Sequence, residues 1–309
     1  MTRTKEDGKE EVFSACIKPD DTRYLGGDKN PSIAAIKLQG RPRTGIRYYT
    51  ANEFCANRGD WITMIDYLEY CALQALCYIE YANFDNQAAL NTNLTSDGFK
   101  QGGLGNGVTN LSWERWAAFN GNNPIVQTYW TAEHNIGNGS TNGDHYELEN
   151  YNADGSNLSV YPAIYRGILN FFGDIWTFIR DVVIINKDKD YNYVYILKKG
   201  VNYADVTKDN VNEKCYLIGC QANTNNFITE FDFQRGVYFI PNKVGSNKKA
   251  DYNWKRGNDG QDTDKAACVL LLGASADDDS RAGSGDFYSN WVQSDYSADA
   301  GFFTTVKLD

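Results

Sequence analysis

The chain has 309 residues, of which 42% are hydrophobic, so it is long and apolar enough to bury a substantial core. Its formal net charge of −10 argues against a nucleic-acid groove, because phosphate binding needs clustered Lys and Arg side chains. The amino terminus is charged, and no run of about 18 apolar residues follows it. The sequence therefore predicts a protein without a secretory signal or membrane insertion, which folds in the cytoplasm of the cell that makes it.

Residues 1–44 are polar, with Gly and Pro punctuation and one short apolar piece, "SIAAIKL". This composition predicts an attachment or oligomerisation arm that precedes a domain spanning residues 45–309.

The strongest helical pattern covers residues 60–84, where apolar side chains recur every three or four residues and mark one face of a helix. These positions are Ile62, Ile65, Leu68, Ala72, Leu76 and Ile79. Asp60 is placed to cap the helix start. The tripeptide Arg-Gly-Asp at 58–60 is thus interpreted as a capping turn rather than an integrin-binding motif.

The seven cysteines are odd in number and include no closely spaced CxxC pair. Cys71 and Cys77 fall within the apolar helical pattern. We expect buried free thiols rather than disulfides or a zinc site.

From about 91 to 160 the chain is rich in Gly, Asn, Ser and Thr, as in "GGLGNG" and "NIGNGSTNGD". "GGLGNG" lacks the Lys-Ser/Thr that follows a phosphate-binding loop. The sequence predicts long loops here, with a few short strands.

The stretch "YRGILNFFGDIWTFIRD", residues 165–181, places Phe172, Ile175, Trp176 and Ile179 at helical spacing. We expect a short helix entered at Gly173, with Gly167 and Gly173 permitting a tight backbone and the aromatic residues sealing a core. The stretch is interpreted as a packing device that positions another surface.

After residue 181 the pattern changes to short β-branched or aromatic runs bounded by Gly, Asn, Asp and Pro. The runs are "DVVIINK", "YNYVYILKK", "CYLIGC", "GVYFIP", "ACVLLLG" and "GFFTTVKL". The second half of the chain is therefore predicted to be mostly sheet and loops.

Four segments of the chain resemble C-type-lectin-fold proteins of gut phages. Many of those proteins are variable receptor-binding proteins diversified by retroelements. The resemblance lies in "YCALQALCYIEYANFDNQAAL", "YRGILNFFGDIWTFIRDVVI", "GVYFIPNKVGSNKKADYNW" and "CVLLLGASADDDSRAGSGDFYSNW", which occur in the family's order. It implies an α+β, C-type-lectin-like fold with two helices, short twisted antiparallel strands and long loops. The Gly/Asn-rich segment at about 91–160 is then an insertion.

The sequence offers no catalytic constellation, and we expect neither an enzyme nor a cofactor. His134 and His145, the two histidines, lie in the polar segment without a metal-binding motif. The segment "DKDYN" at 188–192 lacks the Gly and distal Glu of a calcium loop, so no metal is expected. The copper oxidases of the same fold family use a late cysteine pair, whereas only Cys268 follows Cys220 here.

The carboxyl-terminal segment 284–300 combines Tyr and Trp with Ser, Asn and Asp, the chemistry of antibody paratopes. We predict a binding surface there, although a polar loop that closes a sheet has a similar composition. Trp291, with Phe287 beside it, can alternatively be the buried member of a short strand. The expected ligand-binding residues are Asp286, Tyr288, Asn290, Trp291, Asp295 and Tyr296.

Together with the resemblance, this surface implies a phage virion adhesin of the tail or head fibre type, which binds a host-surface glycan or protein. The alternative is a structural virion protein whose loops contact only neighbouring virion subunits. Both hypotheses place the protein in the virion, as a homo-oligomer such as a trimer, beside other virion proteins.

Overall fold

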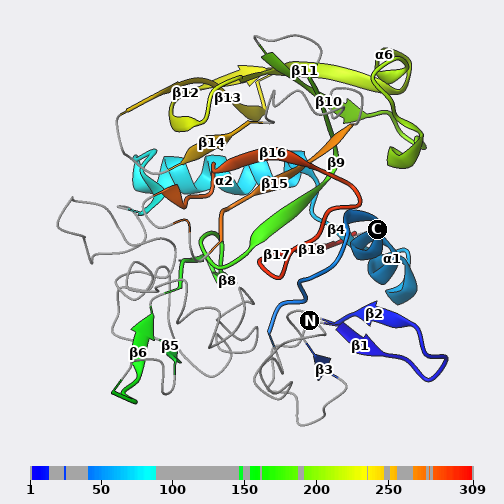
Figure 1. Cartoon of the computed structure of the whole chain (residues 1–309), viewed down its shortest axis with the longest axis vertical. Helices are drawn as coiled ribbons and strands as arrows, with labels where there is room; N and C mark the ends of the chain where they lie inside the picture. The colour runs from blue at the N-terminus through cyan, green and yellow to red at the C-terminus, as the bar shows by residue number, and fades with distance from the viewer. Residues whose placement is uncertain are drawn as a thin grey trace.

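The computed structural model describes residues 2–13, 24–25, 41–87, 146–148, 154–160, 162–186, 191–234, 236–246, 251–255, 267–275, 278 and 281–307. Within these ranges the chain is a mixed α and β structure in which strands predominate (Figure 1). This agrees with the α+β class expected from the sequence. The helices are α1 (Tyr48–Arg58), α2 (Tyr67–Tyr81) and the short α6 (Val211–Lys214), with a 3-10 turn, η4 (Tyr203–Asp205).

A nine-stranded sheet organises the molecule. Its order is β11-β10-β9-β15-β16-β14-β12-β13, and β17 pairs with β9 beside this path. The two end strands, β11 and β13, contact each other, so the sheet curls (Figure 1). The strands are β9 (Trp176–Asn186), β10 (Tyr191–Leu197), β11 (Cys215–Ala222), β12 (Asn226–Gln234), β13 (Tyr238–Gly245), β14 (Tyr252–Trp254), β15 (Cys268–Leu272), β16 (Phe287–Val292) and β17 (Ala300–Gly301).

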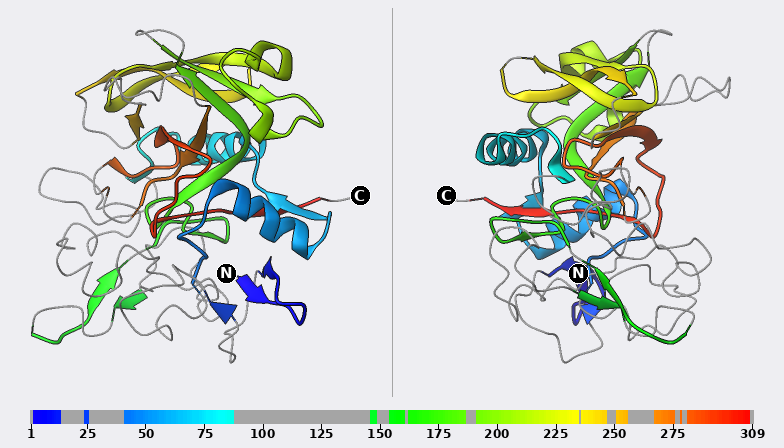
Figure 2. Two further views of the ribbon diagram at one scale, coloured as in Figure 1. Left: turned by 45° about the vertical axis from the view of Figure 1, so that its right-hand side comes forward. Right: turned by 90° about the vertical axis from the view of Figure 1, so that its left-hand side faces the viewer.

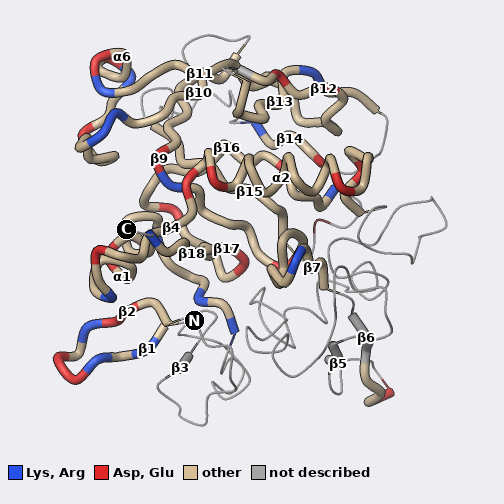
Figure 3. Tube along the Cα trace, turned by 180° about the vertical axis from the view of Figure 1, so that it is seen from behind, with Lys and Arg blue, Asp and Glu red and all other residues tan. Residues whose placement is uncertain are grey.

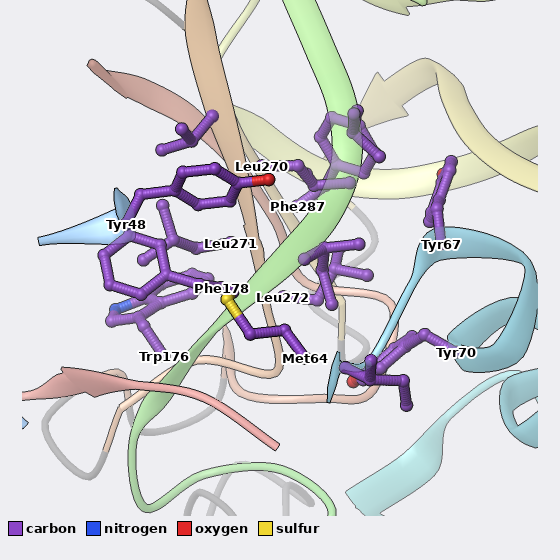
Figure 4. Close-up of a cluster of buried hydrophobic side chains, with 14 of the residues drawn as sticks. Tyr48, Met64, Tyr67, Tyr70, Trp176, Phe178, Leu270, Leu271, Leu272 and Phe287 are labelled. Atoms are coloured by element: carbon purple, nitrogen blue, oxygen red, sulfur yellow. The ribbon is translucent and has the colours of Figure 1, made fainter. Parts of the chain in front are cut away.

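The central strands β9 and β15 carry continuous apolar runs because both of their faces are covered. On one face, Tyr48 of α1 packs edge-on against Phe178, with 6.0 Å between ring centroids. On the other face, Tyr67 of α2 lies 6.4 Å from Phe287. Figure 4 shows Tyr48 and Tyr67 on opposite sides of the β9 ribbon, and Figure 2 shows α2 along one side of the central strands.

Smaller sheets surround this core. The last described strand, β18 (Thr304–Val306), pairs with β4 (Ile62–Met64). Short hairpins are formed by β5 (Tyr146–Leu148) with β6 (Leu158–Val160) and by β7 (Ile164–Tyr165) with β8 (Ile168–Leu169). Apart from β5, β6 and the turn before β6, the Gly/Asn-rich segment at 91–160 lies outside the described residues.

The amino-terminal strands β1 (Thr2–Thr4), β2 (Glu10–Val12) and β3 (Tyr24–Leu25) form a separate three-stranded sheet. Figure 3 shows that the β1–β2 hairpin carries charges of both signs. The hairpin rests on α1, because Asn57 donates a hydrogen bond to the Glu10 carbonyl at 2.7 Å and Arg58 pairs with Glu11 at 3.2 Å. Whether residues 1–44 attach the protein to a partner stays a prediction.

The helix expected over 60–84 is shorter than predicted, and it buries a different face from the one expected. Residues 62–64 form β4, and α2 begins after Asp66, whose side chain and that of Glu69 complete a capping box. Asp60 therefore does not cap this helix; the Arg-Gly-Asp stretch instead closes α1, with Gly59 as its C-cap at φ +140°.

The part of the expected core stripe that lies on α2 points outward, whereas Ile62 and Ile65, which precede the helix, are buried as expected. Leu68, Leu76 and Ile79 are 49%, 53% and 76% exposed, and Ala72 is exposed as well. The buried face consists of Tyr67, Tyr70, Cys71, Gln74, Cys77 and Tyr78. Tyrosines occupy it because their hydroxyl groups find buried acceptors, such as the Phe239 carbonyl for Tyr67 at 2.7 Å. Both stripes have helical spacing, so periodicity alone favoured the wrong one.

The helix predicted within 165–181 is also wrong. The segment forms the β7–β8 hairpin and then enters β9 at Trp176. Gly167 and Gly173 have φ of +82° and +84°, which explains the need for glycine at these turns. The role in packing is confirmed, because Phe171, Phe172 and Trp176 are all buried.

All six predicted strand segments contain strands. The strand β16 was anticipated only as an alternative, and β12 and β14 were not anticipated. The predicted burial of Cys71 and Cys77 is confirmed, since both are 1% exposed. The six cysteines that the structure describes form no disulfide with one another; Cys16 lies outside the described residues.

Candidate functional site

The predicted ligand-binding segment forms β16 and the turn that follows it, and its side chains alternate between two environments. Phe287 and Ser289 are fully buried, whereas Tyr288 is half-buried and Asn290 is exposed. This alternation follows from the two-residue period of a strand. Tyr288 and Asn290 therefore remain on a surface. The alternative that Trp291 is the buried member of a short strand holds only in part: Phe287 and Trp291 both lie in β16, but Phe287 is the buried one and Trp291 is half-buried.

Tyr288 belongs to a row of aromatic rings that crosses four strands. Its ring centroid lies 5.2 Å from Trp176, 6.3 Å from Trp254 and 5.9 Å from Trp291. Tyr252 continues the row, 4.6 Å from Trp254 and 5.2 Å from Phe227. We call this set the aromatic face; its members are Trp176, Phe227, Tyr252, Trp254, Tyr288 and Trp291.

Strand pairing explains why these rings meet. The strands β14 and β16 are parallel, and their register places Trp254 beside Tyr288. Phe227 of β12 likewise lies opposite Tyr252. Directly paired residues share one side of a sheet, so each register adds a ring to the same surface. Trp176 is only 6% exposed and supports the others from beneath, while Tyr288, Trp291, Tyr252 and Trp254 are half-buried.

Polar groups accompany the rings. The Arg281 guanidinium lies 5.0 Å from the Trp254 ring centroid and 6.0 Å from that of Tyr252. The same side chain donates from Nε to the Asp278 carbonyl at 3.1 Å, which holds it in place. The indole Nε1 of Trp254 is buried without a hydrogen-bond partner. Burial raises the pKa of the Tyr288 hydroxyl, against the opposing effect of hydrogen bonds with Asn290 and Trp291.

Asp286 lies beneath the surface rather than on it. Its side chain is fully buried, and neither carboxyl oxygen has a hydrogen-bond partner. Burial raises its pKa well above the usual value, and the nearby Asp278 and Asp251 carboxylates raise it further. This environment favours the neutral form of the carboxyl group over its ionised form. The expectation that Asp286 orients a partner at the surface is therefore not met.

Asp295 and Tyr296 lie in the turn after β16. The Asp295 carboxylate accepts a hydrogen bond from the Val292 backbone at 2.9 Å, so its first role is to shape that turn. Tyr296 is 58% exposed and lies 5.4 Å from the Arg47 guanidinium, which also approaches Tyr49. In the described part of the chain, no close ring pair joins Tyr296 to the aromatic face.

Sequence reasoning did not identify Phe227, Tyr252, Trp254 or Arg281 as site residues. The alternation in "DYNW", with Tyr252 and Trp254 two residues apart, was the available signal for two rings on one strand face. Their placement beside Tyr288 depends on a parallel pairing between strands that are distant in sequence, which no local pattern records.

The structure adds two observations on metals and membranes. Within the described residues, no three His, Cys, Asp or Glu side chains are grouped as metal ligands. His134, His145 and most of the 188–192 segment lie outside those residues. None of the helices in the described part of the chain has the length and apolar character that a membrane crossing requires.

No protein-family model matches the chain, and a search of curated proteins finds no match.

Proposed function

We propose that the chain is an adhesin of a phage particle, with a C-type-lectin-like domain that binds a host-surface glycan through the aromatic face. The observation that carries the proposal is the row of half-buried rings from Tyr252 to Trp291, flanked by Arg281 and Asn290. The C-type-lectin-like fold and the virion location rest on the sequence resemblance.

The chemistry of the aromatic face suits a carbohydrate. A sugar ring presents a patch of C–H groups that packs flat on an aromatic face, while its hydroxyl groups need polar partners. The Arg281 guanidinium and the Asn290 amide provide donors at the edge of the rings. Rigid aromatic side chains lose little conformational entropy on binding, which favours them as contacts.

The test uses the purified chain and cells of the bacterial host or their extracted capsule. We expect Tyr288→Ala to weaken attachment by about 30-fold, as the loss of a hot spot worth 2 kcal/mol does. Tyr288→Phe keeps the ring and should retain most of the binding. Each variant is checked for an unchanged melting temperature.

Tyr296→Ala provides the matched control, because Tyr296 is an exposed tyrosine beside Arg47. Attachment that depends on Tyr296 but not on Tyr288 would move the site to the surface formed by Tyr296, Arg47 and Tyr49. Attachment that survives in both stable variants would contradict the adhesive role of this surface.

A structural virion protein remains the second candidate, and one observation favours it. The stripe of Leu68, Ala72, Leu76 and Ile79 on α2 is exposed, and exposed apolar stripes of this kind mark protein interfaces. In this alternative the stripe contacts a neighbouring virion subunit or a second copy of the chain. Binding to purified virion components, lost in Ile79→Glu and retained in Tyr288→Ala, would favour the structural role.

A further inference from the structure

A pocket of about 420 Å³ lies between the turn that follows α2 and strand β12, apart from the aromatic face. Its volume falls within the range of small-molecule sites. The lining residues are Ala82, Asn83, Phe84 and Asp85 from the turn, Ile228, Thr229, Glu230, Phe231 and Phe233 from β12, and Asp251. We call it the Asp251 pocket.

Three phenylalanines give the pocket aromatic walls. Phe84 and Phe233 are 60% and 48% exposed, and Phe231 is half-buried. Their positions are fixed from within: Phe84 packs on Tyr78 at 4.9 Å, and Phe233 packs on Phe239 at 4.6 Å between ring centroids. Exposed rings anchored in this way form a preorganised apolar surface.

Asp251 lines the pocket, and its carboxylate is buried. The residue is 1% exposed and adopts a left-handed backbone conformation with φ +73°. Its carboxylate accepts hydrogen bonds from the Tyr78 hydroxyl at 2.8 Å, the Gly285 backbone N–H at 2.9 Å and the Asn86 amide at 3.0 Å. Among the described residues no Lys or Arg forms an ion pair with it. Within the described residues, hydrogen bonds rather than an ion pair therefore stabilise the charged form of this carboxyl group.

The remaining charges at the pocket are also acidic. Asp85 and Glu230 line it, and Glu230 pairs with Lys243 at 2.6 Å. No basic side chain is among the described residues that line the pocket. Acidic groups next to aromatic rings attract cations, because the ring face is electronegative and stabilises a cation placed over it.

We propose that the Asp251 pocket binds a small organic ammonium cation, with its alkyl groups against Phe84, Phe231 and Phe233 and its charge toward the Asp251 carboxylate. This site is independent of the glycan site proposed above. A quaternary ammonium or an alkylated amine fits the pocket best, since such cations are easily desolvated and match the three ring walls. The ligand supplies a positive charge that no Lys or Arg among the described residues brings to the buried carboxylate.

The proposal predicts that binding strengthens with pH. Burial raises the pKa of Asp251 to about 7, against the hydrogen bonds from Tyr78 and Gly285, while the charge of Asp85 raises it. Ionised Asp251 is the form that attracts the cation, so affinity should rise by about tenfold from pH 6 to pH 8. The groups that face Asp251 are Tyr70, Tyr78 and Cys77 from α2, Asp85 from the turn and Asp286 from the loop before β16.

Tyr70, Tyr78 and Cys77 do not titrate between pH 6 and pH 8, because burial raises the pKa of each above its ordinary value. Asp286 is the group to separate from Asp251, since its pKa is also raised. The pH dependence of binding should therefore persist in Asp286→Asn.

The experiment titrates the full chain with choline and, separately, with its neutral isostere 3,3-dimethyl-1-butanol. Binding is measured by calorimetry or by NMR of the ligand. We expect choline to bind with a dissociation constant of about 1 mM or tighter and the isostere to bind at least tenfold more weakly. Equal binding of the two would overturn the choice of a cation. The absence of binding by either at pH 8 would overturn the site.

Two variants test the walls without threatening the fold, because both rings are largely exposed. Phe233→Ala and Phe84→Ala should each weaken choline binding by about fivefold, the loss of roughly 1 kcal/mol of cation–ring attraction. The matched control is Tyr216→Ala, an equally exposed ring on β11 outside the pocket lining. Unchanged choline binding in both phenylalanine variants would contradict the proposal.

Discussion

The two faces of the strands β14 and β16 are built from alternating residues of the same short segments, yet they have different chemistry. On the face toward α2, Phe287 packs on Tyr67, and the buried acids Asp251 and Asp286 lie in the same layer as the tyrosines of α2. On the opposite face, Tyr288 and Trp254 form part of a half-exposed row of rings. The first face holds the fold together, and the second is available to a partner. Aromatic content alone does not distinguish the two; the neighbours of each ring do.

The largest effect is expected at Trp176, because this residue is buried beneath the outer row of rings and packs on Tyr288. Trp176→Ala should reduce the free energy of unfolding by about 3–5 kcal/mol, as truncations of large buried aromatics do. Chemical denaturation measures the change. A variant with wild-type stability that has lost ligand binding would show that Trp176 is a contact residue instead.

Tyr78→Phe tests the inner face. The change removes the hydroxyl that donates to Asp251 at 2.8 Å and accepts from Gln74 at 2.7 Å, while it keeps the ring. We expect a loss of about 1–3 kcal/mol, because buried polar partners are left unsatisfied. The same substitution at the half-exposed Tyr288 serves as the control and should cost less. Equal losses at the two positions would remove the distinction between the faces.

Asp286→Asn is expected to act in the opposite direction. The pKa of Asp286 is raised in the folded state, so the folded protein binds more protons than the unfolded chain, and this contribution to stability falls as pH rises above about 4. An amide cannot ionise, so Asp286→Asn should stabilise the protein at pH 8 relative to wild type and change it less at pH 4. The test is to measure the unfolding free energies of wild type and Asp286→Asn at pH 4 and at pH 8. A variant that is less stable than wild type at pH 8 would show that Asp286 is ionised and stabilising.

Ile79→Glu should have the smallest effect on the fold. Ile79 is 76% exposed on the outer stripe of α2, so the change should alter stability by no more than about 0.5 kcal/mol. If this variant unfolds, the stripe is part of the core, as periodicity alone suggested. Sedimentation of the wild type and of Ile79→Glu compares their oligomeric states and shows whether the stripe joins copies of the chain.

Local sequence was sufficient for the features that depend on side-chain type. Runs such as "DVVIINK" and "ACVLLLG" form the buried strands β9 and β15, because β-branched and apolar residues suit a strand that is covered on both faces. The packing role of Phe171, Phe172 and Trp176 and the burial of Cys71 and Cys77 follow from apolar character in the same way.

The tertiary structure alone decided the features that depend on a distant partner. Helical spacing was present on two faces of α2, and the tyrosine face was buried because Phe239 and Ser284 supply acceptors for Tyr67 and Tyr70. Asp286 and Tyr288 are only two residues apart in sequence, yet Asp286 is buried and Tyr288 is half-exposed. The row of rings exists because β14 pairs in parallel with β16 across more than thirty residues of chain. A residue's type and period are local properties, whereas its burial and its partners are set by segments that only folding brings together.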